Sequence, residues 1–149
     1  MKLLSLLFLT IFLGKGCDEQ AANSQMEKDA QTAILEYTAN TRGFYQKITV
    51  ENQMVSISSD RSGNDKPTAV KISDADWKFI KDEFSKIKLD DVPNLKAPTE
   101  KRFYDGAAIA GLKIIFKGKT YQTTDFDHGY PPAEIAVLVN KVVSFGKPK

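Results

Sequence analysis

The stretch FYQKITVENQMVSIS, residues 44–58, decides the fold. In its first half, apolar side chains such as Ile48 and Val50 alternate with polar ones. This period of two is typical of a strand with one buried face. Asn52-Gln53 then provides a short turn, and Val55 resumes the apolar side. We therefore predict an antiparallel hairpin with one face against a core.

The segment after this hairpin predicts a helix. A short strand is expected over 68–72, and Ser73 follows as an N-cap residue. Asp74 and Asp76 then place negative charge in the first turn, where the helix dipole favours it. Apolar residues repeat at helical spacing on one face: Trp77, Ile80, Phe84 and Ile87. Because one face only is apolar, we expect this helix to lie on a core.

The rest of the chain repeats the same plan. A second hairpin is predicted over 112–124 with its turn at Lys117-Gly118. Pro131-Pro132 can open a second amphipathic helix, and a further strand is expected over 33–39. The fold class is therefore α+β: an antiparallel sheet built from two hairpins plus an extra strand, with two amphipathic helices packed on one face. Residues 32–149 form this single domain.

Two polar loops flank the second hairpin, EKRFYDG at 100–106 and TDFDHGYPP at 124–132. If the two strands pair, both loops lie near the same end of the sheet. Arginine and tyrosine in loops are typical of protein interfaces. We expect Phe103 and Tyr104 to be half-buried. The candidate binding surface comprises Arg42, Arg102, Tyr104, Asp105, Asp125, Asp127, His128 and Tyr130.

The same loops raise the question of catalysis. A catalytic zinc typically takes three protein ligands, and His128 is the chain's single histidine. Polar side chains in loops commonly hydrogen-bond backbone groups, and the favoured interpretation is that Asp127 and His128 bond loop backbone or cap the helix that follows. We expect no catalytic residue, metal or cofactor. The alternative is a metal-dependent or carboxylate hydrolase using Asp105, Asp125, Asp127 and His128.

A third loop, DRSGNDKP at 60–67, has the D-x-S-x-N spacing of a calcium loop. However, the sixth position is Asp65 where calcium loops need glycine, and the twelfth is Lys71 where they need glutamate. We therefore expect no calcium site there.

The N-terminal residues predict where in the cell the protein is located. MKLLSLLFLTIFL, residues 1–13, has one lysine and then an apolar run too short to span a membrane, as in a secretory signal. Small residues and the chain's single cysteine, Cys17, follow, which resembles a bacterial lipoprotein signal. We expect residues 1–16 to be the signal peptide and Cys17 to carry lipid, with 17–31 as a flexible tether. Cleavage by ordinary signal peptidase, leaving a free thiol, is the alternative.

The expected location is the cell envelope, at the outer membrane. Asp18-Glu19 resembles the acidic export signal of surface lipoproteins in Bacteroidota, and the choice between periplasmic and surface face stays open. The chain has 21 basic and 19 acidic residues, and two lysines precede Cys17, so the mature chain has 19 of each and no net charge. Nucleic-acid binding normally needs a clustered basic face, so we expect none.

The layout over residues 37–143 resembles small secreted bacterial domains of unknown function and, loosely, the emfourin-like inhibitors of thermolysin-type metalloproteases. The shared pattern is ITVENQMVSISSD, KISDADWKFIKDEFSKIKLDDVP and LKIIFKGKTYQTTDFDHGYPPAEIAVLVNKV. The resemblance implies an α+β fold and a binding role, and it transfers no inhibitory residue. We expect a monomeric, lipid-anchored envelope protein with a non-catalytic binding domain and an envelope or secreted protein partner. A purely structural envelope lipoprotein is a further alternative.

Overall fold

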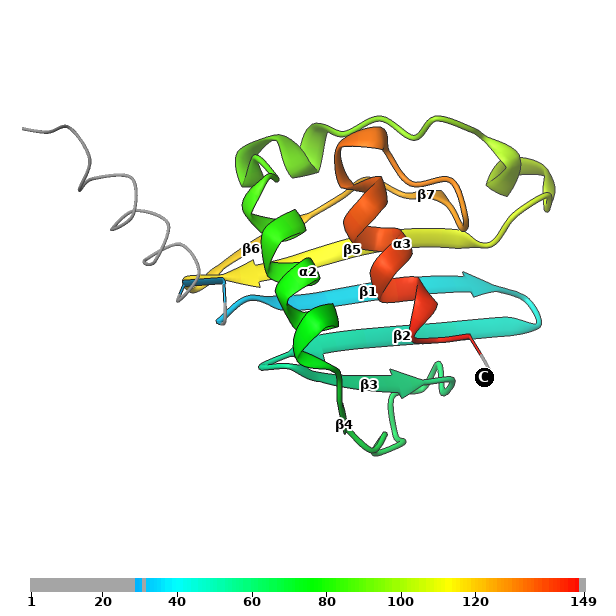
Figure 1. The fold of residues 1–149 in the computed structure, drawn as a ribbon. Helices are drawn as coiled ribbons and strands as arrows, with labels where there is room; N and C mark the ends of the chain where they lie inside the picture. Colours follow the sequence, from blue (N-terminus) through cyan, green and yellow to red (C-terminus); the bar gives the residue numbers. More distant parts are fainter. Residues whose placement is uncertain (1–28, 31, 148–149) are drawn as a thin grey trace, which may run out of the picture.

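The structure is a computed structural model, and it describes residues 29, 30 and 32–147. Within these residues, one antiparallel sheet carries two helices on one of its faces (Figure 1). The strands lie in the order β4-β3-β2-β1-β5-β6, and β7 pairs with β5 beyond the end of β6. Their bounds are β1 Ile34–Thr41, β2 Phe44–Glu51, β3 Met54–Ser58, β4 Val70–Lys71, β5 Ile109–Phe116, β6 Lys119–Gln122 and β7 Phe126–Asp127.

Both predicted hairpins are present, and their turns explain their registers. Asn52 and Gln53 join β2 to β3 with φ of 49° and 63°, and Lys117 and Gly118 join β5 to β6 with φ of 49° and 75°. Two central residues with positive φ make the two-residue turns whose twist matches that of paired strands. The apolar sides of each pair of strands therefore fall on the same face.

The two predicted helices also form, and both lie on that apolar face (Figure 1). Helix α2 spans Asp74–Ser85, and the Ser73 side chain accepts a hydrogen bond from the Asp76 amide, as expected of an N-cap. Helix α3 spans Ala136–Ser144 and follows the 3-10 turn η3, Ala133–Ile135. Their buried residues are Trp77, Ile80, Phe84, Leu138, Val139 and Val142. The α+β prediction is thus confirmed.

Central strand β1 carries the middle of the core. Tyr37 lies opposite Ile48 of β2 and Leu112 of β5, and none of the three is exposed to solvent. Burial of large apolar side chains is worth roughly 1.5–3 kcal/mol each, so this layer between sheet and helices is the main source of stability.

The sheet is larger than predicted. The first strand continues to Thr41 and forms its own hairpin with β2 through Arg42-Gly43. The strand expected over 68–72 shortens to β4, while β7 lies inside a segment that we expected to be a loop. A strand of two residues is too short to show a period. Two 3-10 helices, η1 (Leu89–Asn94) and η2 (Lys101–Tyr104), occupy the connection from α2 to β5.

The expected signal peptide, Cys17 and residues 17–28 of the tether lie outside the described residues. The packed domain begins within the last residues that we assigned to the tether, because Ala30 is buried. The Asp29 carboxylate also accepts a hydrogen bond of 2.6 Å from Lys117 Nζ in the β5–β6 turn. In the part of the chain that the structure describes, no helix is long and apolar enough to cross a membrane.

Candidate functional site

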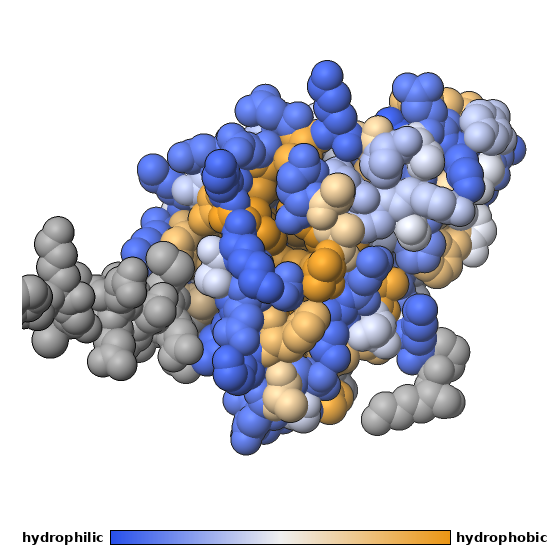
Figure 2. Space-filling view, turned by 45° about the horizontal axis from the view of Figure 1, so that its top comes forward, coloured by the Kyte–Doolittle hydropathy of each residue, from blue (hydrophilic) through white to orange (hydrophobic). Residues whose placement is uncertain are grey.

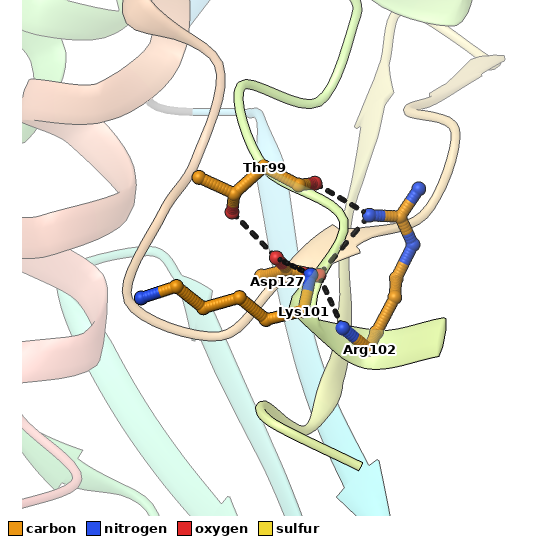
Figure 3. A network of polar contacts seen from close by, with 4 residues as sticks. All are labelled: Thr99, Lys101, Arg102 and Asp127. Carbon is orange, nitrogen blue, oxygen red and sulfur yellow. Dashed lines mark hydrogen bonds and ion pairs between the residues drawn. The ribbon is translucent and has the colours of Figure 1, made fainter. Parts of the chain in front are cut away.

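The two polar loops meet at one end of the sheet, as expected. Figure 3 shows the contact: the Asp127 side chain of β7 reaches Thr99, Lys101 and Arg102 on the connection that contains η2. These partners lie 25 to 28 residues away in the sequence. The β1–β2 turn lies at the same end, where the Phe44 and His128 rings are 5.9 Å apart.

Asp127 is fully buried and accepts four hydrogen bonds. Oδ2 accepts from Thr99 Oγ1 at 2.5 Å and the Lys101 amide at 2.6 Å. Oδ1 accepts from the amide and from Nη1 of Arg102, each at 3.0 Å. Burial alone would raise the pKa of this carboxyl, but the hydrogen bonds and the Arg102 guanidinium hold it well below its usual range. The ionised carboxylate therefore fixes the η2 loop.

Asp127 provides the N-terminal cap that η2 lacks in its own sequence. The first amides of any helix lack partners within the helix, and the residue before η2, Glu100, makes no side-chain cap. Asp127 supplies that cap from another strand. At the far end of η2, Asp105 takes a left-handed conformation and the Gly106 amide donates to Lys101 O at 2.8 Å. A Cβ on Gly106 would lie 2.9 Å from the Tyr104 ring and 3.2 Å from Lys101 O, so a larger residue there would have to displace the exposed Tyr104 side chain.

His128 takes the opposite direction from its neighbour Asp127 and joins the loop to the core. Its amide donates to Ala108 O at 2.9 Å, and Nδ1 lies 2.7 Å from the hydroxyl of Tyr37. Burial and the positive charge of Lys147 lower the pKa of His128, which keeps the ring neutral near pH 7. Burial raises the pKa of the Tyr37 phenol above its usual range. This hydrogen bond joins the end of the sheet to the residue at the centre of its core.

Three aromatic side chains of the loops, Phe103, Tyr104 and Tyr130, are exposed, whereas Phe126 is buried in the core. Phe103 and Tyr104 are 72% and 71% exposed, so the expectation that both are half-buried is wrong. The reason is that Asp127 fastens the loop through polar and backbone groups, which leaves the rings free of the core. Cations lie against two of the rings: Arg102 is 4.3 Å from the centre of Phe103, and Lys101 is 3.9 Å from that of Tyr130.

We call the exposed apolar residues at this end the sheet-end surface: Phe44, Phe103, Tyr104, Ile109 and Tyr130. Each belongs to the β1–β2 turn, the η2 loop or the β5–β7 region. The helix face also exposes apolar residues, Phe79 and Val137, and Figure 2 shows hydrophobic residues in the middle of that side, bordered by hydrophilic ones. On this face Lys141 of α3 joins the two helices: its Nζ donates to Asp76 Oδ1 at 2.5 Å and lies 5.8 Å from the centre of the Phe79 ring.

The eight candidate residues thus fall into two groups. Five are exposed: Arg42, Tyr104, Asp105, Asp125 and Tyr130. The other three are partly or fully buried and hold the loops together: Arg102, Asp127 and His128. Sequence reasoning left Phe44 and Ile109 out of the candidate set, because an apolar residue at a strand end looks like part of the core pattern. Thr99 and Lys101 were also omitted, and nothing in their local sequence indicates a distant carboxylate.

Two of the four residues in the hydrolase alternative, Asp127 and His128, make contacts that hold the loops together. The carboxylate of Asp127 binds the η2 loop, and Nδ1 of His128 binds Tyr37. Among residues 29, 30 and 32–147, no group of three or more His, Cys, Asp or Glu side chains could hold a metal ion. In comparisons with known proteins, no family model, curated protein or solved structure matches this chain.

Proposed function

We propose that this chain is a lipid-anchored protein of the cell envelope whose domain binds a protein partner, without catalysis, through the sheet-end surface. One observation carries the proposal: exposed aromatic residues stand on loops that a buried carboxylate holds in place. Aromatic residues and arginine are enriched at protein interfaces, and tyrosine and arginine are among the residues that contribute most of the binding energy.

The fixed conformation of the η2 loop supports this proposal. A flexible loop loses conformational entropy when it binds, at about 0.5–1.5 kcal/mol for each immobilised side chain of many rotamers. Here the four hydrogen bonds to Asp127 have already ordered the backbone that carries Phe103 and Tyr104. Folding has therefore already ordered this loop, and binding of a partner loses less conformational entropy there.

The position of the N-terminal end of the domain, opposite the sheet-end surface, also supports the proposal. Asp29, the first described residue, pairs with Lys117 at the β5–β6 turn, which is the opposite end of the sheet from the η2 loop. The eight residues of β1 connect the two ends and span roughly 26 Å at 3.3 Å per residue. With a lipid at Cys17, the sheet-end surface would face away from the membrane, where a protein partner can reach it.

The first partner class to test is a thermolysin-type metalloprotease, because the sequence layout resembles the emfourin-like inhibitors. Titration of such a protease with the full chain should reduce peptide hydrolysis to a stoichiometric end point. Loss of inhibition in the Tyr104→Ala/Tyr130→Ala variant would place the contact at the sheet-end surface. If the protease is not inhibited, this partner class is wrong, and the binding surface itself is tested as follows.

A photocrosslinking amino acid at position 104 of the full chain, in its native envelope, tests the binding surface. The control is the same amino acid at position 79, an exposed position on α2. We expect a discrete protein adduct from position 104 and none from position 79. Equal adducts from both positions, or none from either, would contradict the proposal. Mass spectrometry of the mature N-terminus tests the anchor, and an unmodified Cys17 would refute it.

A further inference from the structure

The face of the sheet that the helices leave uncovered carries a second feature. At its centre, Glu36 of β1 lies between Lys113 of β5 and Lys47 of β2. The Glu36 carboxylate forms ion pairs with both ammonium groups, the one with Lys47 at 3.4 Å. Burial acts to raise the pKa of Glu36, but the two lysines outweigh it and lower this pKa, so the group is ionised at neutral pH. One positive charge in this trio remains uncompensated.

These charges line a depression of about 190 Å³. Three other polar residues line it, and they come from three strands: Thr38 of β1, Tyr45 of β2 and Gln122 of β6. Gly111 and Leu112 of β5 complete the lining. Gly111 pairs with Thr38 and has no side chain, so no side chain occupies the depression at that position. Sites for drug-sized ligands span roughly 300–1,000 Å³, so this one has the size for a single ring.

The fold itself does not require glycine at position 111. A Cβ there would lie 3.8 Å from Thr123 Oγ1 and 4.0 Å from Thr38 Oγ1, which is ordinary contact, and the residue is not in the left-handed region. A bulge lies nearby, but its extra residue is on the other strand: Lys113 pairs with Gln122, whereas Ala110 pairs with Phe126. Glycine inside a strand weakens it and often marks close approach of a ligand.

The chemistry of the lining identifies the ligand class. A sugar hydroxyl both donates and accepts hydrogen bonds, and here ammonium groups, a carboxylate, a hydroxyl and an amide surround one depression. The remaining positive charge favours a ligand with one carboxylate. We propose that this depression binds an acidic sugar ring of a glycan, with the ring over Gly111 and its carboxylate toward Lys47 and Lys113. This site is independent of the protein-binding surface proposed above.

The adjoining surface allows the glycan to continue. A second depression of about 230 Å³ shares Tyr45 and Lys47 with the first and extends over β2 and β3 to the loop after β3. Its further lining includes the hydroxyl residues Thr49, Ser56 and Ser58 and the carboxylates of Asp60 and Asp65. Because these carboxylates repel further acidic rings, the two depressions together suit a linear glycan in which one acidic sugar is followed by neutral ones.

Calorimetric titration of the full chain with aldotetraouronate, in which one glucuronate is linked to three neutral xylose units, tests this site. The decisive variant is Gly111→Ala, which adds a methyl group inside the depression without strain. We expect it to weaken binding at least tenfold while its melting temperature equals or exceeds that of the wild type. The matched control is Gly43→Ala, because a Cβ on Gly43 meets nothing within 4 Å and Gly43 lies in the β1–β2 turn away from the depression. This control should bind as the wild type does.

Two further titrants separate the sugar from its parts. Xylotetraose supplies uncharged rings and sodium sulfate supplies an anion without a ring, and both should bind at least tenfold more weakly than aldotetraouronate. Equal binding of sulfate would show a simple anion site, and equal binding of xylotetraose would show that the ligand's charge plays no role. Either result, or absence of binding by aldotetraouronate, or a Gly111→Ala variant of unchanged affinity, would overturn the proposal.

Discussion

Two loops of this protein are organised by an aspartate that accepts four hydrogen bonds, and they differ in where the donors come from. Asp60, after β3, accepts from the amide and hydroxyl of Ser62 and from the amides of Asn64 and Asp65, all within five residues. Asp127 accepts from groups 25 to 28 residues away and is fully buried.

The difference separates a local turn from a part of the tertiary structure. The Asp60 contacts lie at the surface and form whenever those few residues adopt the turn. The Asp127 contacts require β7, the η2 loop and β5 to be in place together. A buried charge without its partners costs far more than an exposed one, so the sheet-end surface is coupled to the stability of the whole domain.

The largest expected effect is that of Asp127→Ala. It leaves the buried Arg102 guanidinium and two loop amides without their acceptor, and we expect a loss on the order of 3 kcal/mol in the free energy of unfolding. Denaturant titration measures it, with Asp60→Ala as the matched control. If the two variants lost the same stability, the contrast between the loops would be wrong.

The second largest effect is expected in the pH dependence of the free energy of unfolding. Because the folded pKa of Asp127 is depressed, its contribution is complete above the unfolded pKa of about 3.9 and is lost as pH falls toward the folded pKa. The free energy of unfolding of the wild type should therefore fall more steeply below pH 4 than that of Asp127→Asn. Parallel curves for the two proteins would show that Asp127 does not titrate in this way.

His128 should produce a smaller effect at higher pH. Its pKa is lowered in the folded state, so the unfolded chain takes up the proton first and stability is lost as pH falls below about 6.5. Replacing it by glutamine, which has a polar side chain but no charge change, should flatten the stability curve between pH 7.5 and 5.5. A slope that persists in His128→Gln would have to come from other groups.

The smallest effect is expected from Asp60→Ala. The amides of Ser62, Asn64 and Asp65 should exchange hydrogen faster, since the carboxylate no longer accepts from them. The exchange of core amides such as that of Tyr37 should not change. Faster exchange throughout β1 would mean that this loop is part of the cooperative core after all.

Most of the fold was predictable from the sequence because short local patterns indicate its strands and helices. The period-two strands, the Ser73 cap and the apolar helix faces each lie within a few residues and agree with the structure, except that Phe44 and Ile57, expected on the inner side of their strands, are exposed. The convergence of the two polar loops also followed, from the geometry of a hairpin. By contrast, the outward position of Phe103 and Tyr104 depends on a carboxylate more than 20 residues further along the chain. No local pattern reports that contact.

The most direct test of the proposed function is a paired measurement of affinity and melting temperature with the partner crosslinked from position 104. The test variant is Tyr104→Ala/Tyr130→Ala, and the control is Phe79→Ala/Val137→Ala, which removes exposed apolar residues from the helix face. We predict that the test variant binds at least tenfold more weakly, that the control binds as the wild type does, and that both melt within a few degrees of it. Unchanged affinity of the test variant, or equal losses in both, would contradict a binding role for the sheet-end surface.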